Sequence, residues 1–228
     1  MRIVFVRHGH PNYADDCLTP LGHQHAQAAA ERLLEENIQR IYSSTCGRAM
    51  ETAGHLSDRT GLEIVRCDFM REISWCSKDG QELFHNGHPW DTADRMIARN
   101  ESLVDLHWHE KEPFLHNSVV DCVEYIAGAT DEWLKTLGYV REGHYYRVMQ
   151  PALDTVAAFG HGGASTAILS HLLNLPFPFV CSHMGPDYTG ITILSLAGEE
   201  GALVSPRIEM LNDAKHICHL KIENVYNR

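Results

Sequence analysis

Short apolar runs alternate with longer amphipathic stretches along this chain. The runs at 3–6 and 156–159 are rich in β-branched and aromatic residues, which is typical of buried strands. Helical periodicity and alanine-rich faces fill the stretches between such runs. We predict strands at 2–7, 38–43, 63–70, 155–160, 190–196 and 203–211, and helices at 21–37, from Arg48 to near Gly61, and at 164–175. This order predicts a three-layer α/β/α fold with a mostly parallel sheet and helices on both faces.

Residues 77–146 interrupt the alternation. They are rich in histidine, tryptophan and acidic residues, with helical periodicity around 90–106 and 119–137. We therefore predict an inserted helical cap over the carboxyl edge of the sheet. A chain of 228 residues fits one domain, so the prediction is a single domain 1–228 with its core at 1–76 and 147–228 and the insertion at about 77–146.

Basic side chains follow three of the predicted strands. Arg7 and His8 close the first strand, His161 follows the strand at 155–160 between two glycines, and Arg48 begins a helix after the strand at 38–43. The carboxyl ends of parallel strands are where open α/β sheets bind ligands. Arginine offers a charged planar fork for phosphate, and neutral imidazole is a nucleophile. The three junctions together predict phosphoryl chemistry on a histidine.

Each of these residues also has an ordinary structural interpretation. His8 could be a strand-end histidine held by hydrogen bonds, Arg48 an exposed helix arginine, and His161 a cap on the following helix. Their shared place at strand ends favours the catalytic interpretation for all three.

Four segments resemble the histidine phosphatase superfamily, the phosphoglycerate-mutase-like proteins. They are Arg-His-Gly at 7–9, Leu-Thr-Pro-Leu-Gly at 18–22 leading to Gln27-Ala28, the segment 43–52 around Arg48, and Gly-His-Gly at 160–162. The resemblance implies that His8 attacks phosphorus and forms a phosphohistidine. It implies that Arg7 and Arg48 hold the phosphoryl oxygens, joined by His161 and amide groups near Gly162, with His161 protonated when it touches phosphate.

Glu72 lies where the family keeps its proton donor. Many members continue after this glutamate with two glycines around an aromatic or apolar residue, whereas this chain continues Ile-Ser-Trp-Cys. Asp79 and Glu82 are therefore alternative donors. Buried carboxylic acids serve as general acids when their pKa rises towards the working pH.

The first loop also departs from the family pattern. Position 14 is alanine where members commonly have asparagine, so Asn12 is the nearby candidate for binding substrate. Thr19 either lines the pocket or caps the helix that begins near Leu21, and the sequence favours neither.

The predicted function is a metal-independent phosphatase acting on a small phosphomonoester. A phosphoglycerate-type mutase shares the first half-reaction, but the residues after Glu72 do not resemble the Leu-Asn-Glu-Arg continuation of the mutases. A non-catalytic binder of phosphorylated ligands on the same fold is the third possibility.

The composition limits the classes of molecule that this protein is expected to bind. A net charge of −11 argues against nucleic acid and anionic membranes, and no apolar stretch approaches the roughly 20 residues that span a bilayer. Seven cysteines without a Cys-x-x-Cys pair favour reduced thiols and a cytoplasmic location. The sixteen histidines contain no HExxH or Cys/His quartet, so no metal and no cofactor is expected. The partner is then a small phosphorylated metabolite; nothing in the sequence indicates an oligomeric state.

Overall fold

The computed structural model describes residues 1–152 and 154–220. The strands are β1 (Arg2–Arg7), β2 (Pro11–Asn12), β3 (Cys17–Leu18), β4 (Ile38–Ser43), β5 (Ile64–Arg66), β6 (Tyr139–Glu142), β7 (Tyr145–Val148), β8 (Thr155–Gly160), β9 (Ile191–Ser195), β10 (Leu203–Val204) and β11 (Arg207–Asp213). The α-helices are α1 (Pro20–Leu33), α2 (Gly47–Thr60), α3 (Pro89–Ala98), α4 (Glu112–Leu115), α5 (Val119–Thr136), α6 (Gly162–Leu173) and α7 (Phe177–His183). Short 3-10 turns lie at Leu34–Glu36, Asp68–Met70, Phe84–Gly87, Trp108–Glu110 and Lys215–Ile217.

Six strands form the central sheet, in the order β11-β9-β1-β8-β4-β5. β1, β8, β4 and β5 run parallel, β9 is antiparallel to β1, and β11 is antiparallel to β9. The predicted α/β fold with a mostly parallel sheet is confirmed. Because β1, β8 and β4 are neighbours, their carboxyl ends deliver the residues at positions 7–8, 160–161 and 43–48 to one edge.

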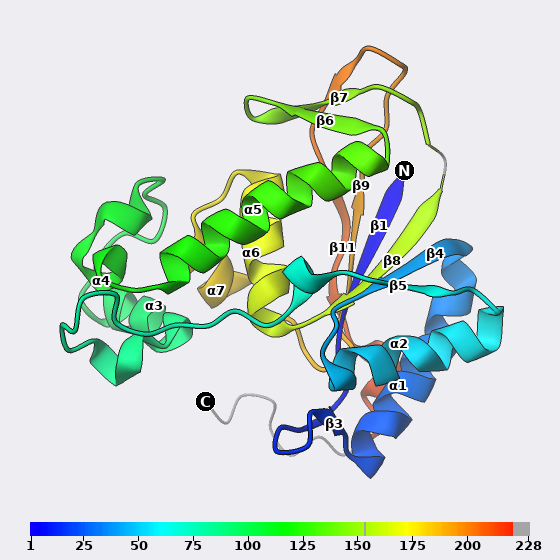
Figure 1. Cartoon of the computed structure of the whole chain (residues 1–228), viewed down its shortest axis with the longest axis horizontal. Coiled ribbons are helices and arrows are strands. Elements are labelled where there is room, and N and C mark those ends of the chain that lie inside the picture. Colours follow the sequence, from blue (N-terminus) through cyan, green and yellow to red (C-terminus); the bar gives the residue numbers. More distant parts are fainter. Residues whose placement is uncertain (153, 221–228) are drawn as a thin grey trace.

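The sheet lies between two layers of helices (Figure 1), each of which covers an apolar cluster. Val4 and Val6 of β1 face the layer that includes Ala30 and Leu33 of α1 and residues of α2. The intervening Ile3 and Phe5 belong to the layer formed with α5, α6 and α7. Alternate residues of a strand point to opposite faces, so a wholly apolar strand indicates burial on both sides. This burial fixes the end of β1, and with it Arg7 and His8, in a rigid position.

Several predicted boundaries need correction. The predicted helix 21–37 ends at Leu33, is continued by a 3-10 turn, and stops where Asn37 adopts a left-handed conformation with φ 52°. The predicted strand 63–70 is confined to β5, and the residues before Arg71 form a 3-10 turn. The predicted strand 203–211 divides into β10, which belongs to another sheet, and β11.

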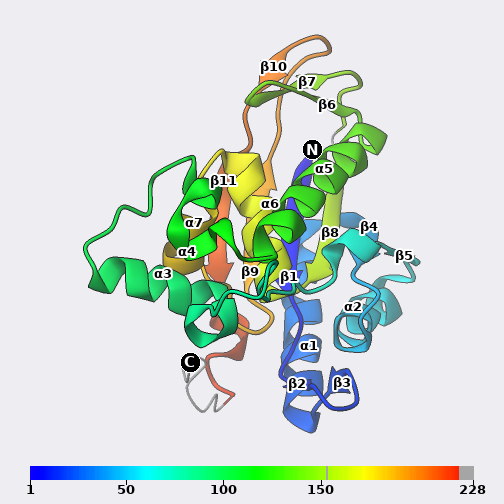
Figure 2. The ribbon, with the colours of Figure 1, turned by 60° about the vertical axis from the view of Figure 1, so that its left-hand side comes forward.

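The predicted helical insertion contains both helices and strands. α3 and α4 lie together at one side of the molecule, while α5 packs along α6 (Figure 1). β6 and β7 form a three-stranded sheet with β10, beyond the end of the central sheet where the N-terminus lies (Figure 2). The prediction of a helical cap was therefore wrong for residues 139–146, which form most of an antiparallel hairpin, with Tyr139 opposite Val148 and Arg141 opposite Tyr146. The boundary placed after residue 146 falls within β7, and the division of the domain into core and insertion stays a prediction.

No helix in the described part of the chain is long and apolar enough to cross a membrane.

Candidate active site

His8 lies at the carboxyl end of β1 and is almost completely buried. Its backbone N–H donates to Gly160 O at 2.9 Å, which ties the residue to the end of β8. Its ring Nδ1 lies 2.7 Å from Gly9 O. A carbonyl oxygen only accepts, so Nδ1 carries the proton and the lone pair of the neutral ring belongs to Nε2.

Burial, followed by the charges of Arg7 and His161, lowers the pKa of His8 well below its usual value. Arg48 acts in the same direction, while the hydrogen bond to Gly9 opposes the shift. The ring is therefore neutral near pH 7, the state in which imidazole is nucleophilic.

Arg7 and Arg48 are each anchored by one end of the guanidinium group. Arg7 Nη1 donates to Pro186 O at 2.8 Å, and Arg48 Nη1 forms an ion pair with Asp16. In both arginines the Nε atom is buried and has no hydrogen-bond partner among the described residues. A buried donor without a partner is costly, and it marks a place where a ligand or water accepts the bond.

His161 follows β8 and stands at the N-terminus of α6, where its side chain makes no capping hydrogen bond. Its ring Nε2 lies 2.8 Å from Ser44 Oγ, and Ser44 Oγ also accepts from Cys46 N at 3.2 Å. The serine hydroxyl hydrogen is then available to Nε2, and in that arrangement the proton of a neutral His161 lies on Nδ1. Nδ1 is likewise buried and without a described partner.

The pKa of His161 is lowered to about 3, first by burial and then by the charges of Arg48, Arg7 and Arg71. His161 is therefore neutral in the free protein. The protonated His161 that the resemblance implies for the phosphate complex stays a prediction, and the charge of a phosphate dianion would oppose these causes.

These groups converge on one small volume at the sheet edge. The rings of His8 and His161 lie with their centroids 5.1 Å apart. The unpartnered Nε atoms of Arg7 and Arg48 and the Nδ1 of His161 are all nitrogen donors. A set of donors of this kind can bind an oxyanion beside a neutral imidazole.

Glu72 lies against the N-terminus of α6. Its Oε1 accepts from Ile73 N at 3.0 Å, Gly163 N at 2.9 Å and Ala164 N at 3.2 Å. Burial is the largest cause acting on its pKa and raises it, although the amide bonds and Arg7 oppose the rise. Because all three amides contact Oε1, a proton on this acid belongs on Oε2.

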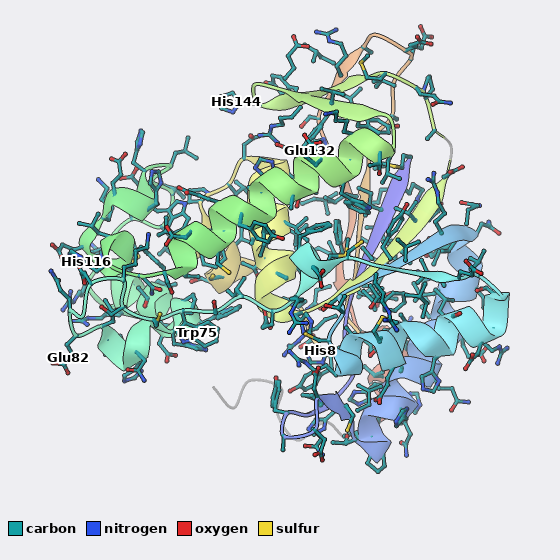
Figure 3. All side chains as sticks on the ribbon, viewed as in Figure 1. His8, Trp75, Glu82, His116, Glu132 and His144 are labelled. Atoms are coloured by element: carbon teal, nitrogen blue, oxygen red, sulfur yellow. The ribbon has the colours of Figure 1, made fainter. Side chains whose placement is uncertain are left out.

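The two alternative proton donors lie elsewhere. Asp79 accepts from Gln81 N and pairs with His116, which together lower its pKa. Glu82 lies in the α3–α4 region, on the far side of Trp75 from His8 (Figure 3). Of the three candidate donors, Glu72 is the one whose carboxyl group lies near enough to Arg7 and Arg48 for their charges to act on its pKa.

The remaining predicted binding residues differ in how close they lie to the arginines. Gly162 begins α6, and a Cβ there would lie 3.7 Å from Arg7 Nε, so the glycine borders the arginine. Thr19 is the N-cap of α1, accepting from Gly22 N at 3.1 Å, and also contacts His10 Nδ1. Asn12 bonds to Asp15 and Ala14 within its own loop. The amides of Gly163 and Ala164 donate to Glu72, and the part of Gly162 in phosphate binding stays a prediction.

Four residues near the site were not among the predicted site residues: Ser44, Asp16, Tyr13 and Tyr188. The only signal for Ser44 was the hydroxyl-rich segment before Arg48. The other three contact Arg7 or Arg48 from loops whose course the sequence does not reveal.

A cavity of about 680 Å³ lies in the α3–α4 region. Its walls include Phe84, Arg95, Met96 and Trp108, and it is lined by none of the candidate catalytic and phosphate-binding residues Arg7, His8, Arg48, Glu72 and His161. Among the described residues, no group of three or more histidine, cysteine or acidic side chains is placed to hold a metal ion.

The family model of the histidine phosphatase superfamily (branch 1) matches residues 3–132, more than half of the chain. The protein therefore belongs to this superfamily, and it is a phosphoric monoester hydrolase of the histidine phosphatase type.

Two relatives show the range of activities named among similar proteins. A putative phosphoserine phosphatase 2 from Hydrogenobacter thermophilus is 28% identical over 214 residues, which cover 89% of this chain and 93% of the relative. A probable phosphoglycerate mutase from Yersinia pestis is 25% identical over 194 residues, covering 77% of this chain and 76% of the relative.

Two solved structures superimpose on this protein over most of its length. A mycobacterial glucosyl-3-phosphoglycerate phosphatase complexed with VO3 superimposes with a TM-score of 0.62 at 26% identity, covering 92% of this chain and 98% of that one. A phosphoserine phosphatase mutant from Entamoeba histolytica superimposes with a TM-score of 0.61 at 18% identity over 95% of this chain and 98% of that one.

Proposed function

We propose that this protein is a metal-independent phosphatase that hydrolyses a small phosphomonoester through a phosphohistidine on His8. One observation carries the proposal: three buried nitrogen donors without described partners belong to residues whose charges act on His8, a neutral, buried imidazole whose tautomer leaves Nε2 free. The donors are Arg7 Nε, Arg48 Nε and His161 Nδ1.

In the first half-reaction, His8 Nε2 attacks phosphorus in line with the leaving oxygen. The N–P bond forms while the bond between phosphorus and the ester oxygen breaks. Charge on the equatorial oxygens is stabilised by the two guanidinium groups and His161. Glu72, whose pKa is raised by burial, donates the proton from Oε2 to the departing alkoxide.

In the second half-reaction, the Glu72 carboxylate takes a proton from water, and that water attacks the phosphohistidine. The N–P bond breaks, inorganic phosphate forms, and His8 returns to its neutral state. Two permanent positive charges at the site perform the charge stabilisation that a metal ion provides in other phosphoryl-transfer enzymes.

We propose a small phosphorylated metabolite as the substrate class. Relatives named for phosphoserine and glucosyl-3-phosphoglycerate support this class and supply the compounds to test. The acidic and histidine-rich segment 77–146 favours substrates with little negative charge beyond the phosphate. Equal or faster turnover of multiply phosphorylated compounds would contradict that preference.

The test compares wild type, His8→Ala and His144→Ala with an aryl phosphate in the presence of a chelator. His144 is exposed and lies far from His8 (Figure 3), so it controls for the loss of a histidine. We expect turnover and an acid-labile phosphoenzyme in wild type and His144→Ala, and neither in His8→Ala.

Activity that survives His8→Ala would refute the assignment of the nucleophile. A phosphoenzyme that transfers its phosphoryl group to an added phosphoglycerate faster than to water would identify a mutase. Phosphate binding without turnover of any compound would identify a binder.

A further inference from the structure

Two tyrosines from separate loops cover the arginines of the site. The Tyr188 ring, in the loop before β9, lies over the Arg7 guanidinium, with 4.4 Å from Cζ to the ring centroid. The Tyr13 ring, in the loop between β2 and β3, lies over Arg48 at 5.3 Å. Aromatic faces attract guanidinium groups, most strongly where water is excluded.

Each tyrosine complements a polar anchor on the same guanidinium. Arg7 is held by Pro186 O, which belongs to the same loop as Tyr188. Arg48 is held by Asp16, which belongs to the same loop as Tyr13. For each arginine, one loop thus supplies both an acceptor for Nη1 and a ring over the guanidinium face. Neither contact uses Nε, which has no partner among the described residues.

The loop that carries Tyr188 is held firmly and under backbone strain. Thr189 is fully buried with φ 52°, a left-handed conformation that is unfavourable for a β-branched residue. Its N–H donates to His8 O at 3.3 Å and its Oγ1 donates to Tyr188 O at 2.7 Å. Strain of this kind persists only where surrounding contacts maintain it, which indicates that the position of Tyr188 matters.

The Tyr188 ring also contacts the nucleophile and its neighbours. Its centroid lies 6.0 Å from the ring of His8 and 5.4 Å from that of His10. Burial raises the pKa of Tyr188, and a side-chain interaction with Tyr13 adds to the rise, so the two loops meet. Tyr13 itself is 65% exposed and stands at the outer rim.

We propose that Tyr13 and Tyr188 are positioning residues, whose stacked rings hold Arg48 and Arg7 in the orientation that binds the transferred phosphoryl group. This inference rests on the proposed function, because it assigns the arginines to phosphate. It predicts that removing either ring weakens phosphate binding, while retaining the ring without its hydroxyl preserves most of it.

The test measures inhibition of aryl phosphate turnover by inorganic phosphate, which depends on the arginines and involves no leaving group. Tyr13→Leu and Tyr188→Leu are each expected to raise the inhibition constant about threefold to tenfold. Tyr13→Phe and Tyr188→Phe are expected to stay within about twofold of wild type, because the aromatic face is retained. Tyr125→Phe, at an exposed position on α5, is the matched control.

Thermal unfolding of each variant separates positioning from folding. If Tyr188→Leu does not fold, Tyr13→Leu still tests the proposal, because its ring is mostly exposed. Leucine variants that bind phosphate as wild type does, or phenylalanine variants as weak as the leucine variants, would overturn it. A wild type that neither binds nor releases phosphate would instead refute the proposed function.

Discussion

The amide nitrogen of Gly163 lies 2.9 Å from Oε1 of Glu72, at the point where α6 begins beside the active site. A Cβ at position 163 would stand only 2.6 Å from that same oxygen and would overlap the Ile73 side chain. The glycine therefore allows α6 to present its first amides to the carboxyl group at hydrogen-bond distance.

Gly163→Ala should displace Glu72. We expect a loss of about 1–3 kcal/mol in the free energy of unfolding, the usual cost of inserting a methyl group into a packed region. We also expect at least about a tenfold fall in kcat/KM, because the acid no longer reaches the leaving group. Denaturant unfolding and steady-state kinetics measure the two effects.

Gly128→Ala on α5 is the matched control. Nothing lies within 4 Å of a Cβ at that position, so the change should stabilise the helix by about 0.5–1 kcal/mol and leave kcat/KM unchanged. Full activity in Gly163→Ala would mean that Glu72 tolerates displacement and is not the proton donor.

Glu72→Gln should affect substrates according to their leaving groups. An alkyl phosphate needs protonation of its leaving oxygen, so its kcat should fall about 10²–10⁴-fold, whereas an activated aryl phosphate should lose far less in its first half-reaction. Rapid measurement of the first turnover isolates that step. Glu82→Gln, in the α3–α4 region, should match wild type on both substrates.

The dependence of turnover on pH follows from the titration of His8 and Glu72. Turnover should rise as pH increases through the pKa of His8, which lies below its usual value of 6.5. It should fall as pH increases through the pKa of Glu72, which lies above its usual 4.5. Glu72→Gln should remove the alkaline fall and keep the acid rise; an unchanged alkaline limb would assign that limb to another group.

Ser44→Ala should loosen the tautomer of His161. Without the hydroxyl, Nε2 loses its 2.8 Å partner and the ring proton is no longer confined to Nδ1. We expect phosphate inhibition to weaken about threefold to tenfold, the worth of one hydrogen bond. Inhibition by inorganic phosphate measures this effect.

Ser43→Ala is the adjacent control, since Ser43 is also buried but its hydroxyl donates to Ser44 O. It should lower stability by about 1 kcal/mol without changing phosphate inhibition. Equal phosphate inhibition in both serine variants would contradict the role given to Ser44.

The strand ends explain why much of the fold and site was predictable. Residues 3–6 are apolar on both faces, which specifies a central strand, and its last residues must lie at the ligand edge. Arg7, His8, Arg48 and His161 are placed by this local logic alone. Glu72 follows no regular element, so only the resemblance indicated it.

Other features depend on contacts between distant loops. The proximity of Tyr188 to Arg7 depends on how the loop before β9 returns alongside β1, which no local pattern encodes. The pairing of β10 with β7 joins residues far apart in the sequence, so no local pattern revealed that residues 139–146, assigned to the helical insertion, belong to a small sheet. Thr19 shows the reverse case, in which a local capping preference was correct while its part in the pocket stays a prediction.

His25 should make the protein sensitive to acid. The residue is fully buried, and neither ring nitrogen has a partner among the described residues. Its pKa is lowered to about 4, first by burial and then by His10 and His216. In the unfolded chain this histidine has a pKa near 6.5, so it binds a proton at a pH where the folded protein does not. The free energy of unfolding therefore falls as pH drops from about 6.5 towards 4.

The expected loss from this one residue is on the order of 2 kcal/mol at pH 4.5 relative to pH 7. His25→Leu removes the titrating group and leaves no hydrogen bond broken, so its free energy of unfolding should decline less over that range. His144→Leu, at an exposed position, should decline as wild type does. Urea unfolding at pH 7, 6, 5 and 4.5 measures the slopes; parallel curves for wild type and His25→Leu would show that His25 does not resist protonation in the folded protein.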